Sequence, residues 1–258
     1  MLFKRNKFLT LILLIIMCIL ATGIFYIKKR ILLEKKIYTP CVEIIKDSIT
    51  TIGIIGDSWA YNSQVYNMDY YIDSLMKTYN HECKVIVYGQ KGAKSKDIYL
   101  SLINHNLNQI NKLDYCIVFS GINDLHGQYG KDFYVHHTTM IIEQLLKYKI
   151  TPIIIEIPSF NNVSQYSKYP KWKQTCYKIL AFYTSGNWSL NNIDIYRKEM
   201  ENRIKSLLKL NNIIYIKTDS ILKGNHSLYS DDMHINLAGN KALYSHIINK
   251  LISSKQTQ

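Results

Sequence analysis

Three residue types that together perform nucleophilic catalysis occur at two distant places in the sequence. Ser58 follows an apolar run at 51–55, and the sequence DDMH near the C-terminus supplies Asp231 and His234. A serine hydroxyl becomes a strong nucleophile when a histidine takes its proton, and a carboxylate must orient that histidine. Asp231 and His234 are three positions apart, so one turn can hold the carboxylate against Nδ1 and leave Nε2 facing Ser58. The spacing is that of a Ser–His–Asp triad.

An acyl-transfer site also needs hydrogen-bond donors for the oxyanion that forms during reaction. Gly92, in GQKGAKS, offers an unobstructed backbone N–H, and Asn123, in SGIND, offers a side-chain amide. With the N–H of Ser58 they make three donors. The tripeptide Gly-Asp-Ser at 56–58 is weak evidence by itself, because a helix N-cap has the same residue types.

These residues need a scaffold that brings distant segments together, and the hydrophobic pattern predicts one. Apolar runs rich in β-branched residues predict strands at 52–55, 85–88, 115–119, 153–157 and 213–216. Segments whose apolar residues have helical spacing lie between these strands or after the last one, at 67–79, 95–110, 132–149, 193–210 and 237–252. Strands that alternate with helices and are apolar throughout are typical of a parallel sheet covered on both faces. We therefore predict an α/β fold, in which ligands bind at the carboxyl ends of the strands.

The sequence resembles a known family, the SGNH or GDSL hydrolases. The resemblance spans about residues 50–253 and is carried by four blocks in the family's order, which are GDSW at 56–59, Gly92, GIND at 121–124 and DDMH at 231–234. Each block alone is weak, and four in order after successive predicted strands are strong. The sequence GxSxG is absent, so the elbow of the ordinary α/β-hydrolases does not explain the serine.

The resemblance implies a role for each matching residue. It implies Ser58 as nucleophile, His234 as base, Asp231 as the residue that orients the base, and Ser58, Gly92 and Asn123 as the oxyanion hole. It also implies a flavodoxin-like, three-layer αβα fold with a five-stranded parallel sheet in the order 2-1-3-4-5, without a metal or other cofactor.

Two departures from the family pattern stand out. Trp59 replaces the leucine of GDSL, at a position that the catalytic roles do not require. The glycine block is loose, with Tyr88 where an asparagine is frequent, so Gly89 remains an alternative to Gly92. We expect Asp57 and Asp124 to be hydrogen-bond partners of neighbouring loops and not acid catalysts.

An aromatic-rich insertion follows the fourth predicted strand, at 158–192. One interpretation is a partly helical excursion packed on the edge of the domain. The other is a substrate-facing wall whose rings stack on sugars, formed by Tyr166, Tyr169, Trp172, Tyr177 and Trp188.

The N-terminus predicts a membrane anchor. Residues 8–27 contain no charge and are long enough to cross a hydrocarbon layer of about 30 Å, and Lys28, Lys29 and Arg30 follow directly. We predict an uncleaved single-pass helix, with a cleaved signal peptide as the alternative. The expected organisation is an anchor at 1–27, a basic tether at 28–50 and a hydrolase domain at 51–258. The basic residues on both sides leave the orientation open, although a short basic N-terminus favours an extracytoplasmic domain.

Charge and cysteine content exclude other classes. The first 36 residues hold eight Lys/Arg and one Glu, which is +7 of the total net charge of +13. The remaining charge is scattered and lacks a nucleic-acid-binding motif, so we expect no nucleic-acid partner. The five cysteines form no zinc-binding pattern, and a disulfide among Cys41, Cys83 and Cys176 stays open.

The sequence therefore predicts a membrane-anchored serine esterase that forms an acyl-enzyme. We expect its substrate to carry O-acetyl groups on a cell-envelope or environmental polysaccharide, or to be a smaller acylated molecule. The alternatives are a polysaccharide O-acetyltransferase with the same triad, a lysophospholipase or thioesterase, and a non-catalytic envelope-binding module. The oligomeric state is not predicted.

Overall fold

A computed structural model describes residues 12–23, 49–105, 112–159, 166–208 and 212–256. The chain divides into two compact units, residues 1–33 and 34–258, which we treat separately. In the first unit, residues 12–23 form a helix. No helix within the described residues combines the length and apolar character needed to cross a membrane. The ends of the predicted span, 8–11 and 24–27, lie outside the described residues.

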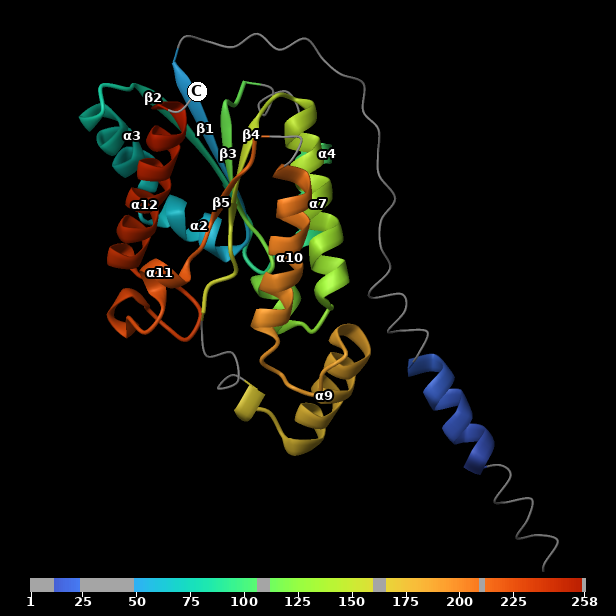
Figure 1. The fold of residues 1–258 in the computed structure, drawn as a ribbon. Helices are drawn as coiled ribbons and strands as arrows, with labels where there is room; N and C mark the ends of the chain where they lie inside the picture. The colour runs from blue at the N-terminus through green and yellow to red at the C-terminus, as the bar shows by residue number, and fades with distance from the viewer. Residues whose placement is uncertain (1–11, 24–48, 106–111, 160–165, 209–211, 257–258) are drawn as a thin grey trace, which may run out of the picture. The chain divides into compact units, whose positions relative to one another are not determined.

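The second unit is built on a five-stranded sheet in the order β2-β1-β3-β4-β5, and every pairing is parallel (Figure 1). The strands are β1 (Thr50–Gly56), β2 (Cys83–Gly89), β3 (Tyr115–Phe119), β4 (Thr151–Ile155) and β5 (Ile214–Ile216). The register aligns Gly56 with Gly89 and with Phe119, so three strands end at one level. This confirms the predicted strand order and three-layer architecture, and it brings the loops after β1, β2 and β3 to one edge.

Helices cover both faces of the sheet, as the absence of polar alternation in the strands predicts. Figure 1 shows α3 and α12 on one side of the sheet and α4, α7 and α10 on the other. Their bounds are α3 (Met68–Thr78), α4 (Ser95–His105), α7 (Lys131–Lys147), α10 (Ile193–Leu208) and α12 (Leu237–Gln256). Shorter or peripheral helices among the described residues are α2 (Ser58–Val65), α6 (Ile122–His126), α9 (Lys171–Ser185), α11 (Asp219–Leu222) and the 3₁₀ turn η1 (His226–Leu228).

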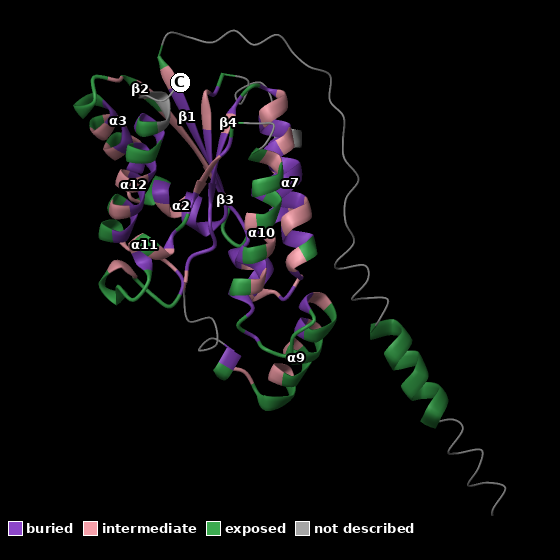
Figure 2. Ribbon diagram, in the orientation of Figure 1, coloured by how far each residue is buried: buried purple, intermediate pink, exposed green. Residues whose placement is uncertain are grey.

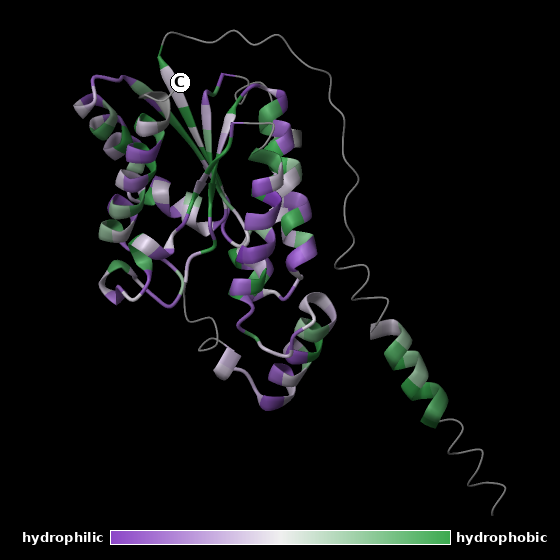
Figure 3. Cartoon of the chain, viewed as in Figure 1, coloured by the Kyte–Doolittle hydropathy of each residue, from purple (hydrophilic) through white to green (hydrophobic). Residues whose placement is uncertain are grey.

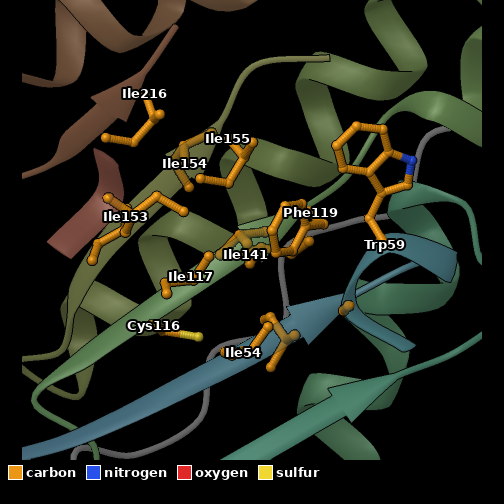
Figure 4. Packing of buried hydrophobic residues seen from close by; sticks show 14 of the residues in the cluster. Ile54, Trp59, Cys116, Ile117, Phe119, Ile141, Ile153, Ile154, Ile155 and Ile216 are labelled. Atoms are coloured by element: carbon orange, nitrogen blue, oxygen red, sulfur yellow. The ribbon is translucent and has the colours of Figure 1, made fainter. Parts of the chain in front are cut away.

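The core lies along the central strands. The buried positions there are filled largely by isoleucine, and in Figures 2 and 3 the middle of the sheet is both buried and apolar. Figure 4 shows Ile54, Ile117 and Ile154 packed in this layer, with Trp59 and Phe119 at its end toward the carboxyl edge. Burial of such side chains contributes about 1.5–3 kcal/mol each, which makes these strands the rigid support of the loops that follow them.

The predicted elements agree with the observed ones apart from their ends. The fourth strand is observed at Thr151–Ile155, two residues earlier than the predicted 153–157. The carbonyl of the buried Ile157 accepts a hydrogen bond from the Arg197 Nε–H at 2.6 Å and so does not pair with a neighbouring strand. The short helices α2 and α6 are too brief for periodicity to reveal. The predicted extensions to 106–110 and 209–210 lie outside the described residues.

Candidate active site

The turn that follows β1 positions Ser58 at the start of α2. Gly56 has φ +148°, and a Cβ at this position would collide with the carbonyl of Phe119, so only glycine fits. The backbone N–H of Asp57 donates to that same carbonyl at 3.3 Å, and the Asp57 Oδ1 accepts from the backbone N–H of Trp59 at 2.9 Å. The Asp57 side chain therefore caps α2. Ser58 is the first residue of the helix, where backbone N–H groups have no partner within the helix.

The structure brings Ser58, His234 and Asp231 into one chain of hydrogen bonds. The Ser58 Oγ lies 3.0 Å from Nε2 of His234. The Nδ1 of His234 lies 2.8 Å from Oδ2 of Asp231. When Nδ1–H donates to the carboxylate, Nε2 is the acceptor that faces the serine hydroxyl. This is the arrangement in which an imidazole can remove the serine proton.

A tight turn holds Asp231 in place against His234. The Asp231 Oδ1 accepts from the backbone N–H groups of Met233 and His234, both at 2.7 Å. Partial burial favours the neutral acid, but these hydrogen bonds and the contact with His234 outweigh it and lower the pKa of Asp231 below its ordinary value. The Asp231 side chain is 56% exposed, so it orients His234 from a partly hydrated position.

Trp59 connects the nucleophile turn with the histidine turn, a role that was not predicted from the sequence. Its indole Nε1 donates to the carbonyl oxygen of Met233 at 3.1 Å, across 174 positions of sequence. The ring is 2% exposed and contacts Phe119 at the end of β3. The residue beside Ser58 is thus bonded to the residue beside His234. A tryptophan in place of the family's leucine is the signal that could have suggested this, because a buried indole N–H requires an acceptor.

The candidate oxyanion donors line the same cleft as the triad. The cleft has a volume of about 480 Å³, and its walls are formed by Ser58, Asn62, Tyr66, Lys91, Gly92, Asn123, Ser230, Asp231, Met233 and His234. Asn123 donates from Nδ2 to the carbonyl of Ala93 at 2.9 Å, which uses one of its two amide hydrogens and fixes the side chain. Gly92 has φ +73° and open space where a Cβ would be. Gly89 instead packs against the backbone of α2 at Tyr61.

Asp124 and Asp57 are both fully buried behind this wall. Asp124 accepts from the backbone N–H and the hydroxyl of Ser95, at 2.9 Å and 2.8 Å, and so ties α6 to the start of α4. Burial raises its pKa to about 6. Burial also raises the pKa of Asp57 to about 7, assisted by the charge of Asp124, and the Asp57 Oδ2 has no hydrogen-bond partner. Asp124 thus links loops as expected, whereas Asp57 caps its own helix.

Four polar or aromatic residues of the cleft wall, Asn62, Tyr66, Lys91 and Ser230, were not singled out from the sequence. Asn62 and Tyr66 reach the cleft because α2 turns them to the same side as Ser58, and Lys91 comes from the loop after β2. The Lys91 ammonium lies 4.4 Å from the centre of the Tyr61 ring, which holds the long side chain in position. A second cleft, of about 690 Å³, shares Ser230 and Asp231 with the first.

The aromatic insertion divides into an inner and an outer set. The Tyr166 ring is buried, stacks on His126 and contacts Tyr177, which in turn contacts Tyr169. The hydroxyl of Tyr166 donates to the carbonyl of His126. These tyrosines therefore pack among themselves and onto the domain. Trp172 is exposed and lines neither of the two clefts, and α9 makes the insertion partly helical, as the first interpretation expects.

The described residues include no group of three histidine, cysteine or acidic side chains arranged to hold a metal ion.

Comparison with known proteins finds similar folds among solved structures. No protein-family model and no curated protein matches the chain. Among solved structures, a putative lipolytic protein of the G-D-S-L family from Desulfitobacterium hafniense DCB-2 has 17% identity and a TM-score of 0.57, covering 78% of this chain and 99% of its own. A lipase/acylhydrolase from Enterococcus faecalis has 17% identity and a TM-score of 0.59, and the match covers 79% of this chain and 95% of the lipase. The acetyl xylan esterase AlAXEase has 19% identity and a TM-score of 0.55, and the match covers 79% of this chain and 98% of the esterase.

The fold is shared with solved lipolytic proteins and esterases, among them one of the G-D-S-L family. The comparisons support the resemblance drawn from the four sequence blocks, at identities where only the fold is conserved.

Proposed function

We propose that the protein hydrolyses carboxylic esters by forming and then hydrolysing an acyl-enzyme. The observation that carries this proposal is the continuous hydrogen-bond chain from Ser58 Oγ through His234 to Asp231, which opens into a cleft. A merely structural serine at a helix start would not require an imidazole at 3.0 Å, held by a carboxylate on its far side.

Each residue of the site has a defined task in this mechanism. The Ser58 Oγ attacks the carbonyl carbon of the ester while Nε2 of His234 takes the hydroxyl proton. Asp231 keeps the imidazole in the required tautomer and stabilises the imidazolium. The carbonyl oxygen becomes an oxyanion, which the N–H groups of Ser58 and Gly92 and the remaining amide hydrogen of Asn123 stabilise.

Collapse of the tetrahedral intermediate releases the alcohol, which leaves with the proton from His234. Water then attacks the acyl-enzyme, with His234 again taking a proton, and a second collapse releases the acid and restores Ser58. The cycle consumes one ester and one water and needs no cofactor.

We propose short acyl groups on a carbohydrate, O-acetyl groups in particular, as the substrate. The cleft wall offers Asn62, Lys91 and Ser230, which can bind hydroxyl groups. One of the similar folds is an acetyl xylan esterase, which supports the same substrate class.

The adjoining second cleft supports a substrate larger than a single sugar. It is lined by Ser159, Asn191, Ile193, Asp194, Leu222, Lys223, Gly224, Asn225, His226, Tyr229, Ser230, Asp231 and Asp232. Most of these residues are polar, and a polymer that extends away from the ester would meet hydrogen-bonding groups along its length.

The test is acetate release from a panel of acetylated glycans, compared between the wild type and Ser58→Ala. We expect the variant to lose activity by several orders of magnitude and to lose labelling by a fluorophosphonate probe. Ser74→Ala on α3 is the matched control, because Ser74 is exposed and lines neither of the two clefts. Unchanged acetate release by Ser58→Ala would refute the mechanism.

The same panel separates the alternative activities. Transfer of acetate to an added oligosaccharide in place of its release would identify an O-acetyltransferase, and faster turnover of long acyl chains would identify a lysophospholipase or thioesterase. Absence of both labelling and turnover would leave a binding module.

We also propose that residues 8–27 anchor the hydrolase domain to a membrane on its extracytoplasmic side. The support is the uncharged apolar sequence and the lysine-rich segment that follows it. Resistance of the full chain to carbonate extraction, with protease accessibility of the domain in intact cells, is the expected result.

A further inference from the structure

The helix α9 has its apolar side turned away from the domain. Ala181 and Ser185 are buried on the face toward the domain, whereas Trp172 is 69%, Ile179 39% and Tyr183 66% exposed. Figure 1 places α9 beyond the ends of α7 and α10, and Figure 2 shows much of its surface exposed. A helix that only packed onto the domain would bury its large apolar residues and expose its small ones.

These exposed side chains form one stripe along α9. Trp172, Cys176, Ile179 and Tyr183 recur at intervals of four, three and four residues, which places them on one face of a helix. Beyond the end of the helix, Trp188 is 55% exposed and stacks on Phe182 with ring centres 4.5 Å apart. We call Trp172, Cys176, Ile179, Phe182, Tyr183 and Trp188 the α9 stripe.

Lysines border the α9 stripe on both sides. At about 100° per residue, Lys173 lies on one side of the stripe, and Lys171 and Lys178 lie on the other. Lys171 and Lys178 are exposed, and Lys173 lies over the Tyr169 ring at 3.8 Å. The sequence from 166 to 192 contains four lysines and no aspartate or glutamate. The region is therefore purely basic around an apolar, aromatic-rich face.

We propose that the α9 stripe docks the domain onto an anionic lipid surface. Tryptophan and tyrosine partition into the interface between headgroups and acyl chains, and lysines beside them bind anionic headgroups while their stems cover apolar surface. A surface of anionic lipid attracts each such lysine. This attachment is separate from the ester-hydrolysing site and goes beyond the proposed activity.

Two other occupants fit the stripe less well. A symmetric contact between two copies would bring the lysine borders of both copies together and would place like charges side by side. A glycan would have to reach rings that line neither of the two clefts. Charge complementarity thus favours lipid, and the experiment separates all three occupants.

The distribution of tryptophan gives a direct assay on the full chain. The three tryptophans are Trp59, Trp172 and Trp188, so the N-terminal apolar segment contains none. Trp59 is 2% exposed and serves as a shielded reference. The full chain is reconstituted into vesicles of phosphatidylcholine with phosphatidylglycerol, with and without bromine on the acyl chains. Bromine quenches only those tryptophans that enter the bilayer, and we expect loss of the emission of Trp172 and Trp188.

Two variants test the apolar and the basic parts of the surface. Trp172→Ser with Ile179→Ser and Tyr183→Ser removes three of the six residues of the α9 stripe and leaves Trp188 as reporter, so the bromine quenching of Trp188 should disappear. Lys171→Gln with Lys178→Gln should reduce quenching in the anionic vesicles toward its level in phosphatidylcholine alone. Val65→Ser with Tyr70→Ser is the matched control, because these exposed residues, at 56% and 74%, lie outside α9, and quenching should match the wild type.

Several outcomes would overturn the proposal. Equal emission in brominated and unbrominated anionic vesicles would show that the stripe stays out of the bilayer. Conversion of a dimer to a monomer by the triple variant, without any quenching in the wild type, would assign the stripe to a second copy. An emission shift with an acetylated oligosaccharide but not with lipid would assign it to substrate. Hydrolysis of a soluble ester should be unchanged in the triple variant, so failure of the esterase proposal and failure of the docking proposal are distinguishable.

Discussion

The indole Nε1 of Trp59 and the carbonyl oxygen of Met233 are joined by a buried hydrogen bond of 3.1 Å. Trp59 directly follows Ser58, and Met233 directly precedes His234. The bond therefore ties the backbone of the nucleophile turn to the backbone of the histidine turn, next to the 3.0 Å contact between the two reacting side chains. Catalysis is sensitive to small displacements of the two reacting side chains, since a misplacement of about 1 Å can cost about 100-fold in rate.

Trp59→Phe tests whether this bond positions His234. The substitution keeps an aromatic ring in the core but leaves the Met233 carbonyl without its donor, and we expect kcat to fall by about 10- to 100-fold with little change in KM. The free energy of unfolding should fall by about 1–3 kcal/mol, as for other unsatisfied buried groups. Steady-state kinetics and denaturant unfolding measure both effects. A loss of stability with unchanged kcat would mean that Trp59 is only a core residue.

Asp231→Asn tests the orientation of the imidazole. The amide Nδ2 replaces the carboxylate oxygen that accepts the hydrogen bond from Nδ1–H of His234. An amide nitrogen donates instead of accepting, so the variant favours the wrong tautomer of His234. We expect kcat to fall on the order of 10³-fold or more, measured with a chromogenic acetyl ester. Asp132→Asn, on an exposed acid of α7 that lines neither cleft, should keep nearly full activity. If both variants behaved alike, the contact between Asp231 and His234 would have no catalytic role.

Asn123→Ala tests the side-chain donor of the oxyanion hole. Removing one such donor costs about 10²- to 10³-fold in kcat in an acyl-transfer enzyme, while KM changes little because the donor acts mainly on the transition state. The variant also loses the bond to the Ala93 carbonyl, so its stability should be measured in parallel. Asn123→Asp has the same shape without the amide hydrogens and should be at least as impaired. Full activity in either variant would place the donor elsewhere.

Asp57→Asn tests the pH dependence of stability. Because burial raises the pKa of Asp57 to about 7, the folded protein holds a proton there that the unfolded chain releases near pH 4. The contribution of Asp57 is therefore fully present below pH 4 and is lost as the pH rises toward 7, by about 1.4 kcal/mol per unit at most. The asparagine cannot ionise, so the variant should gain stability relative to the wild type across that interval. Parallel curves of unfolding free energy against pH would contradict this.

Much of the fold and the candidate site could be predicted because both depend on local patterns. Uninterrupted apolar runs such as 115–119 and 52–55 identify strands buried on both faces, and alternation with helices then makes the sheet parallel. In a parallel sheet the strand ends meet at one edge, so Ser58 and Asn123 could be expected in one cleft before any coordinates were known.

The roles of the aromatic insertion and of the glycine block depend on tertiary packing and not on local patterns. The predicted sugar-binding wall depended on the direction in which each ring points, and a sequence fixes this only once the packing of α9 is known. The choice between Gly92 and Gly89 depended on which glycine faces the cleft and which packs against α2.

The sequence by itself determined the order of the strands along the chain, the positions of the nucleophile, base and acid, and the apolar segment at 8–27. Only the tertiary structure decided that Trp59 bonds to Met233, that the Asp57 carboxyl is buried with one oxygen unpartnered, and that α9 turns its aromatic side outward. The physical reason is that residue type and spacing specify local conformation, whereas burial and hydrogen-bond partners across 174 positions arise only when distant segments pack against one another.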